Sequence, residues 1–316
     1  MRLYFCSDIH GSEKCWLKFL ATPKFYEADV VVLGGDITGK FVVPIIKQPN
    51  GRWKANYLGL QRRVSTEDEL RKLEQQMAYS GYYGFRTTAE EAAYYAENQD
   101  RIEELTKKLM LARLSQWLEV ADRRLKDSGV RCLVIAGNDD AFEIDALLAQ
   151  SKVLENPDGR VLNLNGSMEV IGLSYANMTP WRCSRDVPEE ELAQRIEAAA
   201  SSLARPERAI FDLHVPPYRS GLDMAPRLDD DLRVVMSGEG PQLVPVGSKA
   251  VREAIEKYQP MLGLHGHVHE SKGVAQIGRT TVVNPGSEYA EGILNGVLID
   301  IDEAKGAIVN TQFVSG

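Results

Sequence analysis

The chain of 316 residues is 44% hydrophobic and 26% charged, and its formal net charge is −8. These fractions are typical of an ordinary globular protein and leave room for one large domain or two. No apolar run approaches the roughly 18 residues that a membrane-spanning helix needs, and the negative charge argues against a nucleic-acid partner. The chain begins without the apolar segment of a signal peptide, so we expect a cytoplasmic protein. The four cysteines show no CxxC spacing, and we expect free thiols at Cys6, Cys15, Cys132 and Cys183.

Short apolar runs that end in polar groups recur in the first part of the chain. Residues 2–9 predict a first strand that delivers Asp8 and His10, and residues 12–19 predict a helix. Residues 29–33 and 130–136 are continuously apolar, as buried parallel strands are, and they lead into Asp36 and Asn138. Open α/β sheets bind their ligands at the carboxyl ends of such strands.

The region from 41 to 128 interrupts this alternation. Pro49-Asn50-Gly51 between 41–46 and 53–57 predicts a hairpin, and 67–77 and 87–128 predict helices. We therefore expect a single domain over 1–316 that carries a mainly helical insertion at 41–128. Two interpretations of the insertion stay open, a cap over an active site and a packing or dimer surface, so a homo-oligomer is compatible with the sequence.

Strands and helices alternate again in the second half of the chain. The helices are expected at 141–150, 188–203 and 249–258, and a hairpin about Asn165-Gly166 is expected to join 161–164 to 168–173. Further strands are expected at 209–213, 261–264, 274–277, 280–283, 297–301 and 307–314. Residues 219–245 are rich in Gly, Asp and Pro and predict a flexible or lid-like loop. The pattern as a whole indicates an α/β fold.

Histidines are concentrated in one stretch, since three of the five in the chain are His265, His267 and His269. Alternate side chains of a strand point the same way, so these three could share one face. Imidazole is a common ligand of transition metals, which favours a metal site over a surface run of polar residues. The other two, His10 and His214, each follow a predicted strand.

The strand ends together supply carboxylates, imidazoles and an amide oxygen. A carboxylate can bridge two cations, and mixed nitrogen and oxygen ligands suit manganese, iron, zinc or nickel rather than calcium. Two such cations about 4 Å apart can share a water, lower its pKa and clamp a phosphate. The sequence therefore predicts a site for two divalent metal ions.

Five ordered motifs resemble the signature of the calcineurin-like metallophosphoesterases. They are Asp8-Ile9-His10, Gly35-Asp36, Gly137-Asn138, His214 and Gly266-His267-Val268-His269. The resemblance spans residues 8 to 287, apart from 41–128, and the turn Asn284-Pro285-Gly286-Ser287 gives it weaker support. It implies an α/β fold, a four-layer αββα sandwich of two mixed β-sheets flanked by helices, with the metals at the carboxyl edge.

The resemblance also implies a role for each matching residue. One metal would be bound by Asp8, His10, Asp36 and His269, and the other by Asp36, Asn138, His214 and His267, with Asp36 bridging. A hydroxide between the metals would attack the phosphorus of a small phosphoester. Asp140 would lie beside the metals and orient His10, whereas His265 has no ligand role and is expected as a polar neighbour near the rim.

The chain departs from the family pattern at Asp139, where many members have a histidine that contacts the phosphate and is a candidate general acid. An aspartate is normally ionised at neutral pH and repels a phosphate, and dications lower its pKa further. Diesters with good leaving groups need less acid assistance, so we expect a phosphodiesterase rather than a monoesterase. A non-catalytic metal-binding scaffold module and a metal-dependent nuclease are the alternatives. We expect Asp139, Asn138 and His214 to be the catalytic residues.

Overall fold

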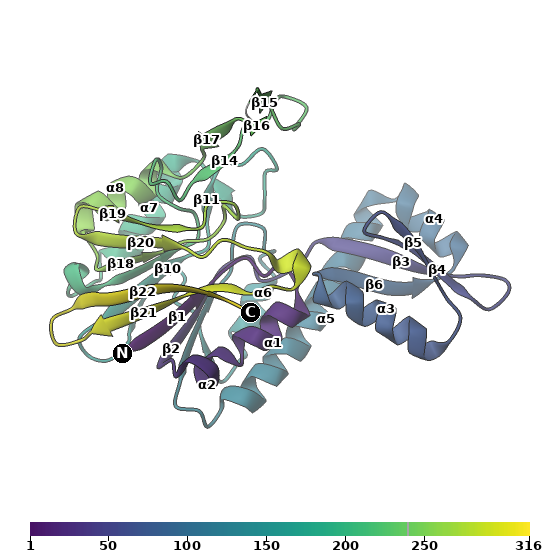
Figure 1. Ribbon diagram of the computed structural model, residues 1–316, viewed down its shortest axis with the longest axis horizontal. Helices are drawn as coiled ribbons and strands as arrows, with labels where there is room; N and C mark the ends of the chain where they lie inside the picture. Colours follow the sequence, from purple (N-terminus) through teal and green to yellow (C-terminus); the bar gives the residue numbers. More distant parts are fainter. Residues whose placement is uncertain (239) are drawn as a thin grey trace.

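Two mixed β-sheets lie face to face in the centre of the molecule, and helices cover their outer faces (Figure 1). The computed structural model describes residues 1–238 and 240–316. The first sheet has the order β22 (Ala307–Ser315), β21 (Asn295–Asp302), β1 (Arg2–Cys6), β2 (Val30–Gly34), β7 (Arg131–Ile135), β8 (Leu154–Glu155). The second has the order β19 (Gly273–Ile277), β20 (Thr280–Asn284), β18 (Leu262–Leu264), β13 (Ile210–Leu213), β10 (Glu169–Leu173), β9 (Val161–Asn163). The predicted αββα sandwich is confirmed.

Both sheets are parallel at their centre, and the first is antiparallel at one edge and the second at both edges. Strands β1, β2 and β7 run parallel, with Tyr4 opposite Val31 and Leu33 opposite Val134. In the second sheet β10, β13, β18 and β20 run parallel. The central strands therefore present their carboxyl ends at one edge of each sheet, which is where a shared site can form.

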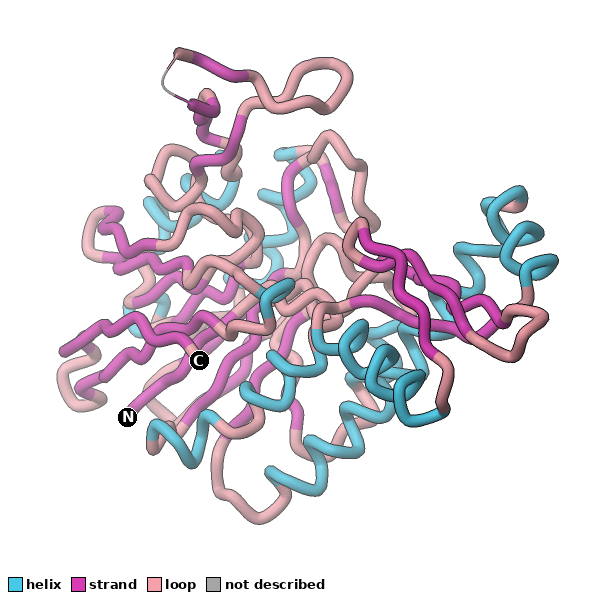
Figure 2. The backbone as a smooth tube through the Cα atoms, turned by 45° about the vertical axis from the view of Figure 1, so that its right-hand side comes forward, coloured by secondary structure: helices cyan, strands magenta, loops and turns pink. Residues whose placement is uncertain are grey.

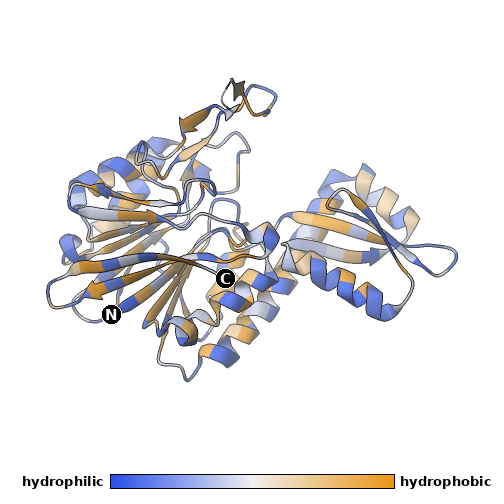
Figure 3. Cartoon of the chain, viewed as in Figure 1, coloured by the Kyte–Doolittle hydropathy of each residue, from blue (hydrophilic) through white to orange (hydrophobic). Residues whose placement is uncertain are grey.

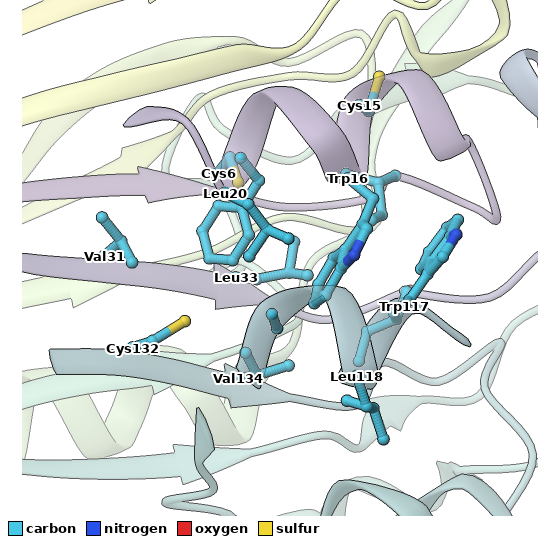
Figure 4. Packing of buried hydrophobic residues seen from close by; sticks show 14 of the residues in the cluster. Cys6, Cys15, Trp16, Leu20, Val31, Leu33, Trp117, Leu118, Cys132 and Val134 are labelled. Atoms are coloured by element: carbon cyan, nitrogen blue, oxygen red, sulfur yellow. The ribbon is translucent and has the colours of Figure 1, made fainter. Parts of the chain in front are cut away.

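Side chains of β1 alternate between two apolar layers, as the period of a strand requires. Leu3 and Phe5 face the core between the sheets, whereas Tyr4 and Cys6 face the helices outside. On that outer side the rings of Trp16 and Trp117 stack with centroids 5.2 Å apart (Figure 4). The hydropathy colouring shows apolar strands inside and polar outer helix faces (Figure 3).

The helices divide between the two outer faces of the sandwich. The first sheet is covered by α1 (Glu13–Phe19), α2 (Thr22–Tyr26), α5 (Gln99–Leu125) and α6 (Ile144–Leu148). The second sheet is covered by α7 (Glu189–Ala200) and α8 (Lys249–Tyr258). All four cysteines are free thiols, as predicted, and Cys183 alone among them is partly exposed. None of the described helices is long and apolar enough to cross a membrane.

A separate small sheet projects from the two-sheet sandwich (Figures 1 and 2). Its order is β5 (Leu60–Val64), β4 (Trp53–Tyr57), β3 (Phe41–Lys47), β6 (Tyr82–Thr87). It carries α3 (Glu67–Tyr79) and α4 (Ala89–Glu97). The chain enters this sheet at β3 and returns to the sandwich through α5. The predicted hairpin of β3 and β4 is confirmed. The strands β5 and β6 were not predicted, and the helix expected over 87–128 is two helices, because Asn98 leaves the helical conformation.

Residues 219–245, which we predicted as a flexible or lid-like loop, contain some regular structure. Their described residues form two short antiparallel ladders, β14 (Met224–Pro226) with β17 (Leu243–Pro245) and β15 (Met236–Ser237) with β16 (Gly240–Pro241). The remaining short elements are β11 (Ala176–Asn177), β12 (Asp186–Val187), η1 (Pro206–Arg208) and η2 (Tyr289–Glu291). Several of these segments border the site described next.

Candidate metal centre

Five central strands deliver the predicted ligands to one place. Asp8 and His10 follow β1, and Asp36 and Asn138 follow β2 and β7 of the same sheet. His214 follows β13 and the pair His267 and His269 follows β18, both in the second sheet. The structure brings all seven residues together, although they are far apart in the sequence.

The side chains form three groups of possible ligands, and the ligand atoms of each group lie within 4.8 Å of one another. Two of them match the predicted ion sites, Asp8 with His10 and His269, and Asp36 with His214 and His267, whereas the third, His10, Asp36 and Asp139, overlaps both. His10 Nε2 lies 3.1 Å from His269 Nε2, and His214 Nε2 lies 3.3 Å from Asp36 Oδ2. Asp36 Oδ2 is also 3.6 Å from His10 Nε2, so this carboxylate faces both predicted ion sites.

Four of these residues have a strained backbone conformation. Asp8, His10, Asp36 and His267 have φ of 57°, 38°, 47° and 65°, in the left-handed region that non-glycine residues rarely adopt. Such strain persists only where the surrounding structure imposes it, and it gathers at functional sites. Position 137 needs a glycine because a Cβ there would lie 2.1 Å from Asp36 Oδ1.

His214 is held in the orientation that a metal ligand needs. Its Nδ1 lies 2.8 Å from the carbonyl oxygen of Gly34, which accepts the ring proton and leaves Nε2 as the donor atom for a metal. That Nε2 is buried and has no hydrogen-bond partner among the described residues. Similarly, the amide nitrogen of Asn138 donates to Asp186, and its Oδ1 lies 2.9 Å from His267 Nδ1. The residues present therefore fit a pair of divalent cations.

The carboxylates and imidazoles of the cluster shift one another's pKa. Burial alone would lower the pKa of His214, but the neighbouring Asp36 carboxylate outweighs burial and raises it to about 10. Burial raises the pKa of Asp36, but His214 and His10 outweigh it and hold that pKa below its usual range. Burial lowers the pKa of His267 to about 4, so this ring is neutral at pH 7. A cation that enters must replace the proton of His214.

Comparisons with known proteins agree with this architecture. No family model matches the chain. An uncharacterised protein of Methanocaldococcus jannaschii is 29% identical over 177 residues, which are 55% of this chain and 67% of that one. One solved structure, 17% identical, covers 98% of both chains with a TM-score of 0.56. That structure shares the overall fold of this chain.

Two other solved structures align less closely. The protein TT1561 of Thermus thermophilus is 16% identical and covers 100% of this chain and 97% of its own, with a TM-score of 0.49. A phosphatase of Mycoplasma pneumoniae is 12% identical and covers 100% and 93%, with a TM-score of 0.46. At these identities the comparisons bear on the fold alone, and the activity of this chain is argued from its own site.

Three predictions about residues at or near the site are wrong in detail. The strand β18 ends at Leu264, so strand alternation does not place His265, His267 and His269 on one face. His265 takes no part in the cluster, as expected, but it is buried, and its Nδ1 lies 2.7 Å from the carbonyl oxygen of Leu213. It packs in the interior and not near the rim.

Asp140 does not orient His10. Its carboxylate accepts hydrogen bonds from backbone amides of the loops after β2 and β7 and from the Thr38 hydroxyl. It therefore joins the two loops that carry Asp36 and Asn138. The acid that faces Nδ1 of His10 is Asp139, 3.8 Å away.

A cavity of about 350 Å³ opens over the cluster. Its floor includes His10, Asp36, Asn138 and His267, and its apolar wall comes from residues 181, 225, 226, 228, 234 and 246. None of the residues 41–128, all of which are described, lines this cavity. The role of the insertion as a cap or as a dimer surface stays a prediction.

Sequence reasoning missed three residues of this cavity. Lys40 and Cys183 both contact Asp139, and the Trp181 side chain is 63% exposed beside them. Lys40 directly precedes β3 and belongs to no sequence motif. The segment that carries Trp181 and Cys183 has no periodic pattern, so only the fold reveals its place.

Proposed function

We propose that this protein is a metal-dependent phosphoesterase that hydrolyses small phosphodiesters with two divalent cations, manganese, iron, zinc or nickel. The observation that carries the proposal is the pair of ligand groups with Asp36 between them. When bound, two such cations would lower the pKa of a water and neutralise the phosphate oxygens.

The side chains around the cluster supply binding and orientation. Asp8 accepts hydrogen bonds from the backbone amide of His267, at 3.0 and 3.1 Å, and so fixes the histidine loop against β1. Ser287 donates to the carbonyl oxygen of Asp8 at 2.6 Å, which ties the Asn284–Ser287 turn to the same place. A site held from several elements keeps its ligands within the narrow geometry that phosphate attack requires.

Two features support a preference for diesters over monoesters. The apolar wall gives the second organic group of a diester a surface that a monoester would leave in water. Asp139, whose carboxylate is paired with Lys40, stands where the family pattern has a histidine that can protonate a leaving group, and a diester with a good leaving group needs less of that assistance. Both features act on the substrate and not on the metals.

The test is hydrolysis by chelator-treated protein to which Mn²⁺, Fe²⁺, Zn²⁺ or Ni²⁺ is returned. We expect bis(4-nitrophenyl) phosphate to be cleaved faster than 4-nitrophenyl phosphate, and the best metal to bind at two ions per chain. Asp36→Asn should lower kcat by about a hundredfold or more, because both ion sites lose a ligand. Asp127→Asn, at an exposed position, is the matched control.

Three results would count against the proposal. Activity that survives Asp36→Asn excludes chemistry at this cluster. Protein that binds two ions and cleaves no phosphoester favours a metal-binding scaffold module. Cleavage of single-stranded DNA with a steep dependence on salt favours a nuclease.

A further inference from the structure

Lys40, Asp139 and Cys183 form a contact cluster in the wall of the cavity, and all three line it beside the metal ligands. Lys40 Nζ lies 2.5 Å from Asp139 Oδ2. Cys183 Sγ lies 2.8 Å from the other oxygen, Oδ1, to which the thiol donates. Both oxygens of the Asp139 carboxylate are therefore occupied by donors from distant parts of the chain.

The cluster stands directly against the metal ligands. Asp139 Oδ2, which accepts from Lys40, is also 3.8 Å from His10 Nδ1. The backbone amide of Asp139 donates to Asp36 Oδ1 at 3.0 Å. A phosphate held over Asp36 and His10 would thus meet the cluster on one side.

The backbone next to Lys40 is held in place, whereas the ammonium of its side chain reaches solvent. The preceding Gly39 donates its amide to the Tyr83 hydroxyl at 3.0 Å, and a Cβ on Gly39 would lie 2.3 Å from the Gly81 carbonyl oxygen. The Lys40 side chain is 53% exposed, and Asp139 is its one partner among the described residues. An ammonium on a fixed backbone and a flexible stem can contact an entering anion without leaving Asp139.

The net charge of Lys40 and Asp139 determines whether the cluster attracts or repels a phosphate anion. Asp139 alone would be an uncompensated carboxylate at the entrance to a phosphate site, and it would weaken phosphate binding. Lys40 cancels that charge and offers remaining N–H donors to the cavity, since an ammonium has three. Burial lowers the pKa of Lys40, but contact with Asp139 outweighs burial and leaves it raised, so the cation persists at neutral pH.

We propose that Lys40 is a substrate-binding residue, whose ammonium contacts a non-bridging phosphate oxygen while Asp139 and Cys183 hold it in position. This inference rests on the proposed function, because it assigns a further phosphate ligand to the same site. The inference also accounts for an aspartate at position 139 where many family members have a histidine, because the Asp139 carboxylate holds the Lys40 ammonium. The phosphate is then held between the cation pair and Lys40.

The decisive experiment is a charge cycle measured on metal-saturated protein. In Lys40→Met the carboxylate is uncompensated, so inorganic phosphate should bind about tenfold to a hundredfold more weakly, and KM for bis(4-nitrophenyl) phosphate should rise in parallel. In Asp139→Asn the cation is uncompensated, so phosphate should bind more tightly than in the wild type. The double variant should fall between the two single variants, and Lys40→Arg should retain most of the affinity.

The control is Lys47→Met, at the other end of β3, where the ammonium lies over the Trp53 ring and away from the cavity. It should change neither phosphate affinity nor KM. Metal content, measured for every variant, shows that each comparison is made at equal occupancy. A structural role for Lys40 would lower the unfolding midpoint and leave phosphate affinity unchanged, which would overturn the inference.

The outcomes separate this inference from the proposed function. Robust hydrolysis with the same KM in Lys40→Met overturns the role of Lys40 and leaves the phosphodiesterase standing. Phosphate binding that depends on Lys40 in a protein that cleaves no ester supports the binding role and overturns the phosphodiesterase.

Discussion

Asp139 is the residue whose replacement should most change substrate preference. A histidine there removes a negative charge and introduces a group with an ordinary pKa near 6.5, which can donate a proton to a poor leaving group. We expect Asp139→His to raise the ratio of monoesterase to diesterase activity, on the order of tenfold or more. The measurement is kcat/KM for 4-nitrophenyl phosphate and its bis ester.

Asp139→Asn separates the two causes of that change. It removes the charge as histidine does, but it supplies no proton at neutral pH. If both variants shift the ratio equally, the charge of Asp139 accounts for the preference and proton donation does not. An unchanged or lower ratio in Asp139→His would contradict our account of this position.

The candidate ligands could be located from the sequence because each follows an apolar strand. Continuous apolar runs before Asp36 and Asn138 identified buried parallel strands, and parallel strands meet at one edge. The contacts of Lys40 and Cys183 with Asp139 were not predictable, because no local pattern relates residues so far apart. The role of Asp140 was missed for a similar reason, since its partners are backbone amides, which the residue types do not reveal.

At the level of elements, the prediction found the hairpin of β3 and β4 but missed other strands of the small sheet. The strand β5 (Leu60–Val64) is almost wholly exposed, so it has no apolar alternation to recognise. The prediction that His265, His267 and His269 share one face of a strand was wrong for a different reason. The left-handed φ of His267 interrupts the extended conformation that strand alternation requires. At β5 and at His267, contacts with the rest of the fold determine the backbone conformation, and the periodicity of the sequence does not.

The turn between α3 and β6 couples the small sheet to the metal centre. Gly81 has φ +83°, and a Cβ there would lie 2.2 Å from the carbonyl oxygen of His10. We expect Gly81→Ala to destabilise the protein by about 2–4 kcal/mol, from backbone strain and the forced displacement of a backbone oxygen. Because His10 is a proposed ligand, metal affinity should also fall.

A matched control for Gly81→Ala is available in the same sheet. Gly59 has φ +71°, and a Cβ there meets no atom within 4 Å. Gly59→Ala should therefore cost only the backbone strain, about 1–2 kcal/mol, and leave metal affinity unchanged. Denaturant unfolding and calorimetric metal titration measure both quantities, and equal effects of the two substitutions would show that the contact with His10 does not matter.

For the molecule as a whole, the layer between the two sheets contains a carboxyl group that the proposed chemistry does not use. Asp212 lies on β13 and is fully buried, and a Cβ on Gly34 of the opposite sheet would lie 3.0 Å from its Oδ1. Neither of its oxygens has a hydrogen-bond partner among the described residues. Burial raises the pKa of Asp212 to about 8, against an effect of His214 that lowers it.

This carboxyl makes the stability of the metal-free protein depend on pH. Below pH 4 it is protonated in both the folded and the unfolded chain, so it contributes no difference. As the pH rises from about 4 to about 8, the unfolded chain ionises while the folded chain holds its proton, and the free energy of unfolding falls. Asp212→Asn removes the ionisation, so the variant should gain stability over the wild type across that interval, by several kcal/mol and at most about 5 at pH 8.

The measurement is urea unfolding of chelator-treated wild type, Asp212→Asn and the exposed control Asp127→Asn between pH 4 and pH 9. Histidines of the metal cluster titrate in the same interval, but they do so in all three proteins, and the difference between variants isolates position 212. Asp127→Asn should follow the wild type at every pH. A constant offset for Asp212→Asn, or a gain that shrinks as the pH rises, would mean that the folded protein ionises this carboxyl and that the layer between the sheets solvates it.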